Sequence, residues 1–511
     1  MMKTNLLGIL SLLLLIACNQ PVSRVTDKTA IEAGTTNIVA GTATLTGSIT
    51  SPNDTSKDSI YVNVFIPHPI SGETVSYKAL VDQSGEFSVD VDVETAVSLV
   101  GLNISLNPYK TLYIELTSGG VTNLDITYNS DFEVENIDIT PATMTQYDMI
   151  HGLEVMNKML TYRSGRSLEP LYNKSTEYYQ NLFKAGISER LRILSNDSLL
   201  SNELKEVLSK DLRLTRYTTH VFNYESEMIL NYRNTSDNKS NKPDIQKIDR
   251  TYYRFLKDFK LNDPQYLHVS SFSEFQKEIL QNEILGLPEI AESDIPSWLA
   301  SVKVTLSDLV GFDHGPYYDV LAANAYARQL NEEVRPLTEK QKEHIAAYWK
   351  GGEIAKILFR KNQQVAALDK FKSPAVVIDI SSVSADKVIQ TILAKHKNKV
   401  VLIDLWATWC GPCLTAMNEF RSTKGEFHDK DVVFVYLTDT SSPRERWEEK
   451  TKGIGSEHYY LTDAQWEYTM NQFEFEAIPA YLLYDKEGVL INKFIAFPGK
   501  GEVKGMINSL L

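Results

Sequence analysis

The feature that most constrains the fold is an apolar strand that leads, through a short loop, into a pair of cysteines. Residues 400–405 are continuously apolar except for Asp404. The loop and the segment after it carry Trp409, Cys410, Gly411, Pro412 and Cys413. A proline is tolerated in the first turn of a helix, where its missing N–H group is no loss, so a helix is predicted to begin near Cys410. A strand followed directly by a helix predicts an α/β layer with a central sheet.

The spacing of the two cysteines indicates redox chemistry. Two residues separate Cys410 from Cys413, so one helical turn brings the two sulfurs within reach of a disulfide. The first thiol stands at the predicted N-terminus of the helix, where unpaired backbone N–H groups and the helix dipole favour an anion. Because the thiolate is the nucleophilic form, this placement activates Cys410. We therefore expect dithiol–disulfide exchange with Cys410 as the attacking sulfur.

Two other uses of a cysteine pair are less well supported. A structural zinc ion needs four ligands, and the chain has three cysteines in all, the third being Cys18. His396 and His428 are isolated in the sequence. Peroxiredoxins carry a proline upstream of the reactive cysteine, and the loop before Cys410 has none. We expect no metal, no cofactor apart from the cysteine pair, and no peroxidase activity.

Residues 409–413 resemble the active site of thioredoxins. Asp404 matches the buried carboxylate that exchanges a proton with the second cysteine in that family. Ile478 and Pro479 match the family's cis-proline segment, which precedes a strand. The long connection before Pro479, together with the N-terminal signal described below, is similar to the TlpA/ResA-like family of extracytoplasmic thiol–disulfide oxidoreductases. The resemblance covers about residues 373–511.

The resemblance implies a protein-disulfide reductase. In such an enzyme Cys410 would attack a substrate disulfide, Cys413 would resolve the mixed disulfide and Asp404 would take the proton of Cys413, while Trp409 would cover one side of the site. The Gly-Pro pair between the cysteines is that of thioredoxin, whose couple lies at about −270 mV. The implied partners are protein disulfides as substrates and a membrane thiol relay as the electron donor. A disulfide oxidase or isomerase remains open, and so does a ligand- or partner-binding lipoprotein with an accessory thioredoxin fold.

Around the expected proton path the sequence departs from the family at three places. Ala416 stands where members often carry Glu, and Asn418 stands where many helices of this fold carry Pro. The predicted strand over residues 432–438 lacks the Lys that partners the buried Asp in thioredoxins. These departures leave the partner of Asp404, and with it the reduction potential, unassigned.

The N-terminus has the pattern of a secretory signal. Lys3 precedes an apolar run over residues 6–16, which is short for a membrane span, and a small residue stands directly before Cys18. Residues 15–18 resemble the lipobox of bacterial lipoproteins. After residue 18 the sequence offers no uninterrupted apolar stretch of membrane-spanning length.

The lipobox resemblance implies that the chain is anchored by lipid. Residues 1–17 would be a signal peptide that is removed, Cys18 would be lipidated, and residues 18–40 would form a tether. Two or more acyl chains hold a protein stably on a membrane. We expect the periplasmic face of the cell envelope, and we favour the outer membrane because Asn19, not Asp, follows the cysteine.

The rest of the chain is predicted to be multidomain. Residues 41–140 are predicted to form a small antiparallel, sandwich-like β domain, residues 141–370 a helical domain, and residues 371–511 a thioredoxin-like α/β domain. The first prediction rests on the alternation of apolar and polar residues over 87–93, which is the period of a strand. In the second, Thr338 and Gln341 are predicted to form a capping box at the start of a helix.

Charge and aromatic content add two expectations. The formal net charge is −14, which repels phosphate backbones, so no nucleic-acid partner is expected. His68 stands between two prolines and is predicted to lie in a loop. Tyrosines of the helical region are predicted to pack helix against helix with their hydroxyl groups at the edge. They are Tyr172, Tyr178, Tyr179, Tyr217 and Tyr224.

Overall fold

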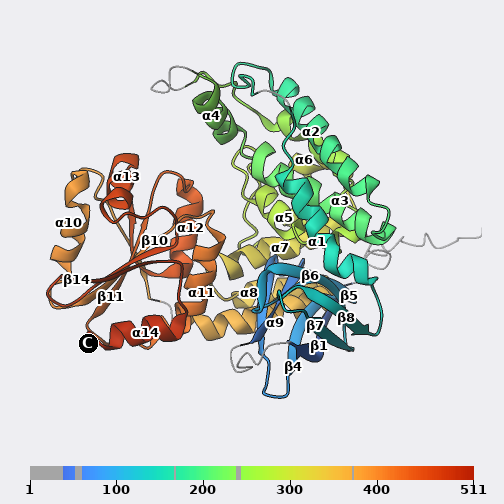
Figure 1. The fold of residues 1–511 in the computed structure, drawn as a ribbon. Coiled ribbons are helices and arrows are strands. Elements are labelled where there is room, and N and C mark those ends of the chain that lie inside the picture. The colour runs from blue at the N-terminus through green and yellow to red at the C-terminus, as the bar shows by residue number, and fades with distance from the viewer. Residues whose placement is uncertain (1–37, 52–59, 166–167, 237–242, 371–372) are drawn as a thin grey trace, which may run out of the picture.

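The computed structural model of the chain describes residues 38–51, 60–165, 168–236, 243–370 and 373–511. The predicted signal peptide, the predicted lipidation site at Cys18 and residues 18–37 of the predicted tether lie outside the described residues. Figure 1 shows a strand-rich region, a helical region and an α/β region following one another along the chain. Within the described residues, no helix combines the length and the apolar character that crossing a membrane requires.

The N-terminal region is built from two four-stranded sheets. One has the strand order β4-β1-β7-β8 and the other the order β3-β2-β5-β6. The strands are β1 (Ile38–Thr50), β2 (Tyr61–His68), β3 (Glu73–Leu80), β4 (Glu86–Thr95), β5 (Val97–Ile104), β6 (Asn107–Thr117), β7 (Val121–Tyr128) and β8 (Val134–Thr140). Alternate side chains of both sheets form one apolar core, so the predicted β-rich domain is present.

Two details of this domain differ from the prediction. The sheets are not wholly antiparallel, because β1 and β7 run parallel, with Thr44 opposite Val121. β6 and β7 follow one another in the chain but lie in different sheets, and this crossing lets both strands face the shared core. His68 does not lie in a loop. It ends β2, is buried, and its Nε2 lies 2.9 Å from the carbonyl oxygen of Asp92.

The middle region is helical. Its α-helices are α1 (Gln146–Thr161), α2 (Thr176–Asn196), α3 (Asn202–Arg216), α4 (Tyr224–Thr235), α5 (Phe272–Leu280), α6 (Ile295–Val310), α7 (Pro316–Asn331), α8 (Glu339–Trp349) and α9 (Glu353–Asp369). Shorter helical turns are η2 (Tyr217–Val221), η3 (Arg250–Phe259) and η4 (Pro264–His268). The predicted capping box of Thr338 and Gln341 is confirmed at the start of α8.

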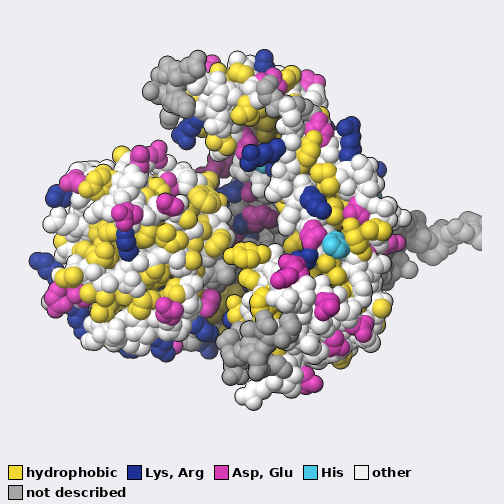
Figure 2. All heavy atoms as spheres, viewed as in Figure 1, with side chains coloured by type: hydrophobic (Ala, Val, Ile, Leu, Met, Phe, Trp, Pro, Cys, Tyr) yellow, Lys and Arg dark blue, Asp and Glu magenta, His cyan; other side chains and the backbone are white. Residues whose placement is uncertain are grey.

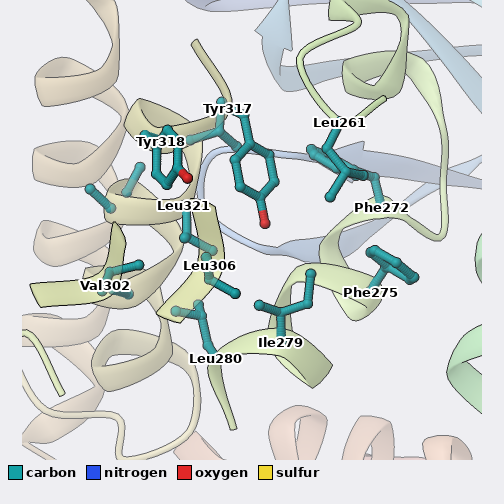
Figure 3. Close-up of a cluster of buried hydrophobic side chains, with 14 of the residues drawn as sticks. Leu261, Phe272, Phe275, Ile279, Leu280, Val302, Leu306, Tyr317, Tyr318 and Leu321 are labelled. Carbon is teal, nitrogen blue, oxygen red and sulfur yellow. The ribbon is translucent and has the colours of Figure 1, made fainter. Parts of the chain in front are cut away.

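The helical region has a core of its own, rich in aromatic rings. Figure 3 shows part of it, where Phe272 and Phe275 of α5 lie near Tyr317 of α7. Tyr179 and Tyr224 are buried in the same core and pack edge to face, with ring centroids 5.6 Å apart. Tyr179, Tyr217 and Tyr224 therefore pack in this core, as predicted, whereas Tyr178 is 42% exposed.

The C-terminal region has a six-stranded sheet with the order β14-β13-β10-β11-β12-β9. Its strands are β9 (Ala375–Ile378), β10 (Val400–Leu405), β11 (Val432–Thr438), β12 (Ser456–Tyr460), β13 (Ala480–Tyr484) and β14 (Leu490–Ile495). Its helices are η5 (Ala385–Lys387), α10 (Val388–Lys395), α11 (Gly411–Gly425), α12 (Arg444–Ile454), α13 (Asp463–Gln472) and α14 (Lys500–Asn508). β10 lies inside the sheet, parallel to β11 and antiparallel to β13, so every residue of it is buried.

Ion pairs join α12 of the C-terminal region to the helical region. The Nη1 and Nη2 atoms of Arg446 donate to the two carboxylate oxygens of Glu278 at 2.8 and 2.6 Å. In a second pair the arginine comes from the helical region: Arg328 of α7 donates to the two carboxylate oxygens of Glu449 on α12 at 2.7 and 3.0 Å. Paired, planar contacts of this kind fix orientation as well as position.

The three regions meet around a hollow. Figure 2 shows the surface drawn inward there, with charged side chains inside it. A cavity of about 420 Å³ lies at this junction and is lined by Glu73 of β3, Lys277 of α5 and Leu414 of α11 among others. The outer side of α11 therefore faces the other two regions across a partly open space.

Candidate active site

The alternation of side chains along β10 decides which groups share one face of the sheet. Val400, Leu402 and Trp406 pack in the core that also holds Cys410 and Cys413. Val401, Ile403 and Leu405 pack in the core on the opposite face. Because neighbouring side chains of a strand point to opposite faces, Asp404 lies on the cysteine side.

The two cysteines form a disulfide at the start of α11. Their Cα atoms are 5.3 Å apart, and Cys410 is the N-cap residue, whose Sγ accepts the backbone N–H of Cys413 at 3.2 Å. Both cysteines are buried, but Cys410 keeps 4% of its surface exposed whereas Cys413 keeps none. An incoming thiol or disulfide can therefore reach Cys410 first. Pro412 stands in the first helical turn, as its missing N–H group allows.

Asp404 is buried beneath this pair, in a setting that disfavours its charge. One carboxylate oxygen, Oδ1, is buried without a hydrogen-bond partner among the described residues. Burial raises the pKa of Asp404 well above its ordinary value, while the charge of Lys424 acts in the opposite direction. A raised pKa moves proton exchange by this carboxyl group toward neutral pH, which suits a group that must accept and return a proton.

Lys424 is a residue of the site that the sequence reasoning did not find. It comes from the last turn of α11 and not from β11, where the family comparison placed a lysine. Its Nζ donates to the carbonyl oxygen of Ile454 at 2.6 Å and lies 3.4 Å from the hydroxyl oxygen of Tyr436. Burial, helped by the positive charge of Arg421, lowers the pKa of Lys424 to about 7 even though Asp404 raises it. The only sequence signal was a lysine on the same helical face as Cys413, about three turns later, and many helices carry a lysine at such a position.

The aromatic groups around Lys424 are uncharged. Burial, with the added effect of Asp404, raises the pKa of Tyr436, so its phenol keeps its proton. His458 of β12 stacks on Tyr436 with ring centroids 5.1 Å apart. Burial lowers the pKa of His458 to about 3, so its ring is neutral at pH 7. Asp404 and Lys424 are therefore a titratable pair set among neutral aromatic groups.

The loop after β11 holds the cysteine loop in place. The backbone N–H of Thr408 donates to Ser442 Oγ at 3.0 Å, and Ser442 in turn hydrogen-bonds Thr438 at 2.8 Å. Trp409 is 63% exposed, and its indole N–H donates to Ser441 Oγ at 3.0 Å. Trp409 thus stands as an exposed flat surface beside the disulfide. The two serines were not singled out from the sequence, since nothing in the pattern of residues 439–442 distinguishes them from a surface turn.

Ile478 and Pro479 complete this side of the site. The peptide bond between them is cis, and Ile478 packs against the core that contains both cysteines. The carbonyl oxygen of Pro479 accepts the backbone N–H of Ala496 at 2.9 Å, which ties the segment to the end of β14. The structure therefore brings together Asp404, Cys410, Cys413 and the cis-proline segment. Among the described residues, no group of three or more His, Cys, Asp or Glu side chains is placed to hold a metal ion.

A comparison with protein families agrees with this geometry. Residues 371–510 match the redoxin family model. This part of the chain, called the redoxin domain below, contains the disulfide, Asp404 and Pro479. The regions before it are not covered by that match.

Individual relatives match the same kind of domain. Over 122 residues the chain is 30% identical to thioredoxin Y2, chloroplastic, of Arabidopsis thaliana, covering 23% of this chain and 56% of that protein. Over 60 residues it is 35% identical to thioredoxin of Mycoplasma genitalium, covering 12% of this chain and 57% of that protein. The chain thus spans little more than half the length of these relatives. The thioredoxin domain of a thiol-disulfide oxidoreductase from Bacteroides vulgatus aligns with a TM-score of 0.21 and 22% identity, over 23% of this chain and 84% of that one.

Proposed function

We propose that this chain is a membrane-anchored, extracytoplasmic thiol–disulfide oxidoreductase that reduces protein disulfides. One observation carries the chemistry. The disulfide of Cys410 and Cys413 caps α11, with Cys410 slightly exposed and Cys413 fully buried on the same sheet face as Asp404. The match of residues 371–510 to redoxins supports a redox use of this arrangement.

The proposed reaction starts from the reduced pair. The Cys410 thiolate attacks one sulfur of a substrate disulfide, so a mixed disulfide forms and the other substrate sulfur leaves as a thiolate. The Cys413 thiol then loses its proton to Asp404 and attacks Cys410 Sγ. The second substrate thiol is released and the Cys410–Cys413 disulfide forms. The substrate gains two electrons and the enzyme loses two, so a dithiol donor must reduce Cys410–Cys413 again.

The N-terminus of α11 and the carboxyl group of Asp404 act in different steps of the proposed reaction. Backbone N–H groups at the start of α11 favour a negative charge on Cys410, including the N–H of Cys413 that already points at its sulfur. Asp404 serves the second step, because the buried Cys413 thiol has no direct access to water. The exposed face of Trp409 and the Ile478–Pro479 segment flank Cys410 and offer a surface to a partner chain.

The direction and the location belong to the same proposal. The Gly-Pro pair between the cysteines supports a reducing couple like that of thioredoxin. The signal-like N-terminus and Cys18 support anchoring by lipid at the periplasmic face of the envelope, with a membrane thiol relay as the electron donor. A disulfide oxidase or isomerase uses the same chemistry at a higher potential, so the potential separates the two.

The decisive test combines activity with redox potential. Purified chain should reduce insulin with a dithiol donor, and Cys410→Ser should abolish this reduction, whereas Ser441→Ala, which keeps both cysteines, should retain it. A Cys410–Cys413 potential near −270 mV supports a reductase, and a value well above −200 mV makes the chain an oxidase or isomerase. Equal insulin reduction by wild type and Cys410→Ser would reject the redox role and favour a binding lipoprotein. Loss of membrane association in Cys18→Ala tests the anchor.

A further inference from the structure

A second cavity lies far from the disulfide, inside the helical region. It has a volume of about 220 Å³ and lies between α2, the end of α3 and α4. Figure 1 shows α2 and α4 in the upper part of the view, at the end of the helical region away from the strand-rich region. Its walls are largely apolar, and their apolar members are Leu168, Leu171, Tyr179, Leu182, Phe183 and Ile187. The cavity therefore offers apolar contacts to a ligand, although one wall residue, Leu168, is itself 78% exposed.

Two arginines interrupt these apolar walls. Arg190 of α2 and Arg216 of α3 both line the cavity, and the Nε–H group of each is buried without an acceptor in the described chain. Burial, together with the positive charge of Arg190, lowers the pKa of Arg216. A guanidinium group nevertheless keeps its charge in a protein. Two cations thus stand beside one apolar cavity, each with an unused donor.

The charge of Glu189 acts on Arg190 and that of Glu227 acts on Arg216, but neither guanidinium group donates a hydrogen bond to that carboxylate. The two terminal nitrogens of Arg190 donate hydrogen bonds to backbone carbonyl oxygens, to that of Gly186 at 3.0 Å and to that of Tyr162 at 2.8 Å. The guanidinium of Arg216 lies over the ring of Phe183, 5.8 Å from its centre. Glu227 carries the negative charge that acts on Arg216, but its carboxylate is bound by His220 at 2.8 Å. Leaving a buried charged donor unpaired is costly, and an anion in the cavity would remove that cost.

Gly186 keeps the cavity open. It lies within α2 and lines the cavity, although glycine destabilises the interior of a helix relative to alanine. A Cβ at this position would lie 3.4 Å from Nη1 of Arg190, with no other atom within 4 Å. A side chain longer than alanine would therefore extend into the cavity beside the guanidinium groups.

We propose that this cavity binds a small amphipathic carboxylate, with the carboxylate at Arg190 and Arg216 and an apolar chain along the walls of α2. A carboxylate matches the planar donor pattern of a guanidinium. The volume has room for about seven groups of the size of a water molecule, at roughly 30 Å³ each, which corresponds to a medium-length chain. Glu169 also lines the cavity, but its Oε1 accepts a hydrogen bond from the Tyr178 hydroxyl at 3.0 Å. This carboxylate therefore does not form an ion pair with Arg190 or Arg216. The site does not depend on the redox activity.

Isothermal titration calorimetry on the purified full chain tests the proposal with three probes. Octanoate has both the charge and the chain, acetate has the charge alone, and octan-1-ol has the chain alone. We expect one octanoate per chain and at least tenfold weaker binding of the other two probes. Arg216→Met should weaken octanoate binding at least tenfold, while Arg233→Met, at an exposed arginine of α4, should leave it unchanged.

Gly186→Leu provides a second variant that does not remove a charge. Leucine favours a helix more than glycine does, so this variant should stay folded while it fills the cavity, and octanoate binding should be lost. Circular dichroism verifies the fold of each variant. The proposal is overturned if octanoate does not bind, if octan-1-ol or acetate binds as tightly, or if Gly186→Leu binds octanoate as the wild type does.

Discussion

One buried carboxylate, that of Glu332, contributes to the contact between the redoxin domain and the helical region. Its Oε1 lies 3.3 Å from Nζ of Lys277 on α5, and its Oε2 accepts from Lys450 on α12. The Glu332 side chain is only 9% exposed. Burial alone would raise the pKa of Glu332, but the charges of Lys277 and Lys450 outweigh it and lower the pKa to about 2. Replacing this residue by Gln leaves two buried ammonium groups without their shared anion.

The size of the effect follows from the pKa. A fall from 4.5 to about 2, at roughly 1.4 kcal/mol for each tenfold change, corresponds to about 3 kcal/mol of folding free energy at pH 7. Because the folded pKa is the lower one, this stability is present above pH 4.5 and is lost as the pH falls toward 2. At pH 3 the same linkage leaves about 1.4 kcal/mol. The pH 7 value agrees with the roughly 3–5 kcal/mol for breaking a buried ion pair.

Urea unfolding of the wild type and of Glu332→Gln, followed by circular dichroism at pH 7 and at pH 3, measures both values. Glu274→Gln is the matched control. Glu274 also lies 3.3 Å from Lys277, but its side chain is 54% exposed, so its loss should cost less than about 1 kcal/mol. A cost for Glu332→Gln below about 1 kcal/mol at pH 7, or an equal cost at both pH values, would refute the reasoning.

Three further results are expected. Asp404→Asn should slow insulin reduction about a hundredfold, because the proton acceptor for the second thiol is lost. The same variant should be more stable than the wild type at pH 8. A carboxyl group whose pKa is raised in the folded state destabilises the folded protein as the pH rises through that pKa. Gly453→Ala should weaken docking of the redoxin domain on the helical region by about 1–3 kcal/mol, since a Cβ at this position overlaps the backbone oxygen of Glu332. Limited proteolysis measures the loss of docking. Gly505→Ala is the control, because a Cβ at that position meets no other atom. Thermal unfolding of the wild type and of Lys424→Met should show the wild type gaining stability relative to the variant between pH 7 and pH 10. The reason is that Lys424 has a lower pKa in the folded state than in the unfolded state, so the folded state binds fewer protons in this range. Parallel stability curves would contradict a lowered pKa of Lys424.

The sequence predicted those structural features that depend on one short segment of the chain. The apolar run of β10 and the cysteine pair after it predicted a strand, a turn and a helix, because each step depends only on neighbouring residues. The capping box at Thr338 was readable for the same reason. The opposite case is His68, whose flanking prolines indicated a loop; pairing of Pro67 with Thr74 and of His68 with Glu73 across β2 and β3 overrode that local preference.

The arrangement of distant segments was not readable in the same way. Tertiary packing alone decided that β1 and β7 run parallel, because the alternation of apolar residues is the same for either direction. It also decided that Lys424 on α11 faces Asp404, since the sequence places twenty residues and a helix between them and leaves the direction of each side chain open.

The sequence by itself determined the reactive pair and its place at a helix N-terminus, because both depend on local spacing. The expectation that Asp404 is a buried carboxylate came from the resemblance to thioredoxins. Only the tertiary structure decided the partner of that carboxylate, the serines that hold the cysteine loop, the ion pairs that dock the redoxin domain and the arginine-lined cavity of the helical region. Each of these needs two or more elements to approach within a few ångströms, and that approach depends on how the whole chain buries its apolar surface.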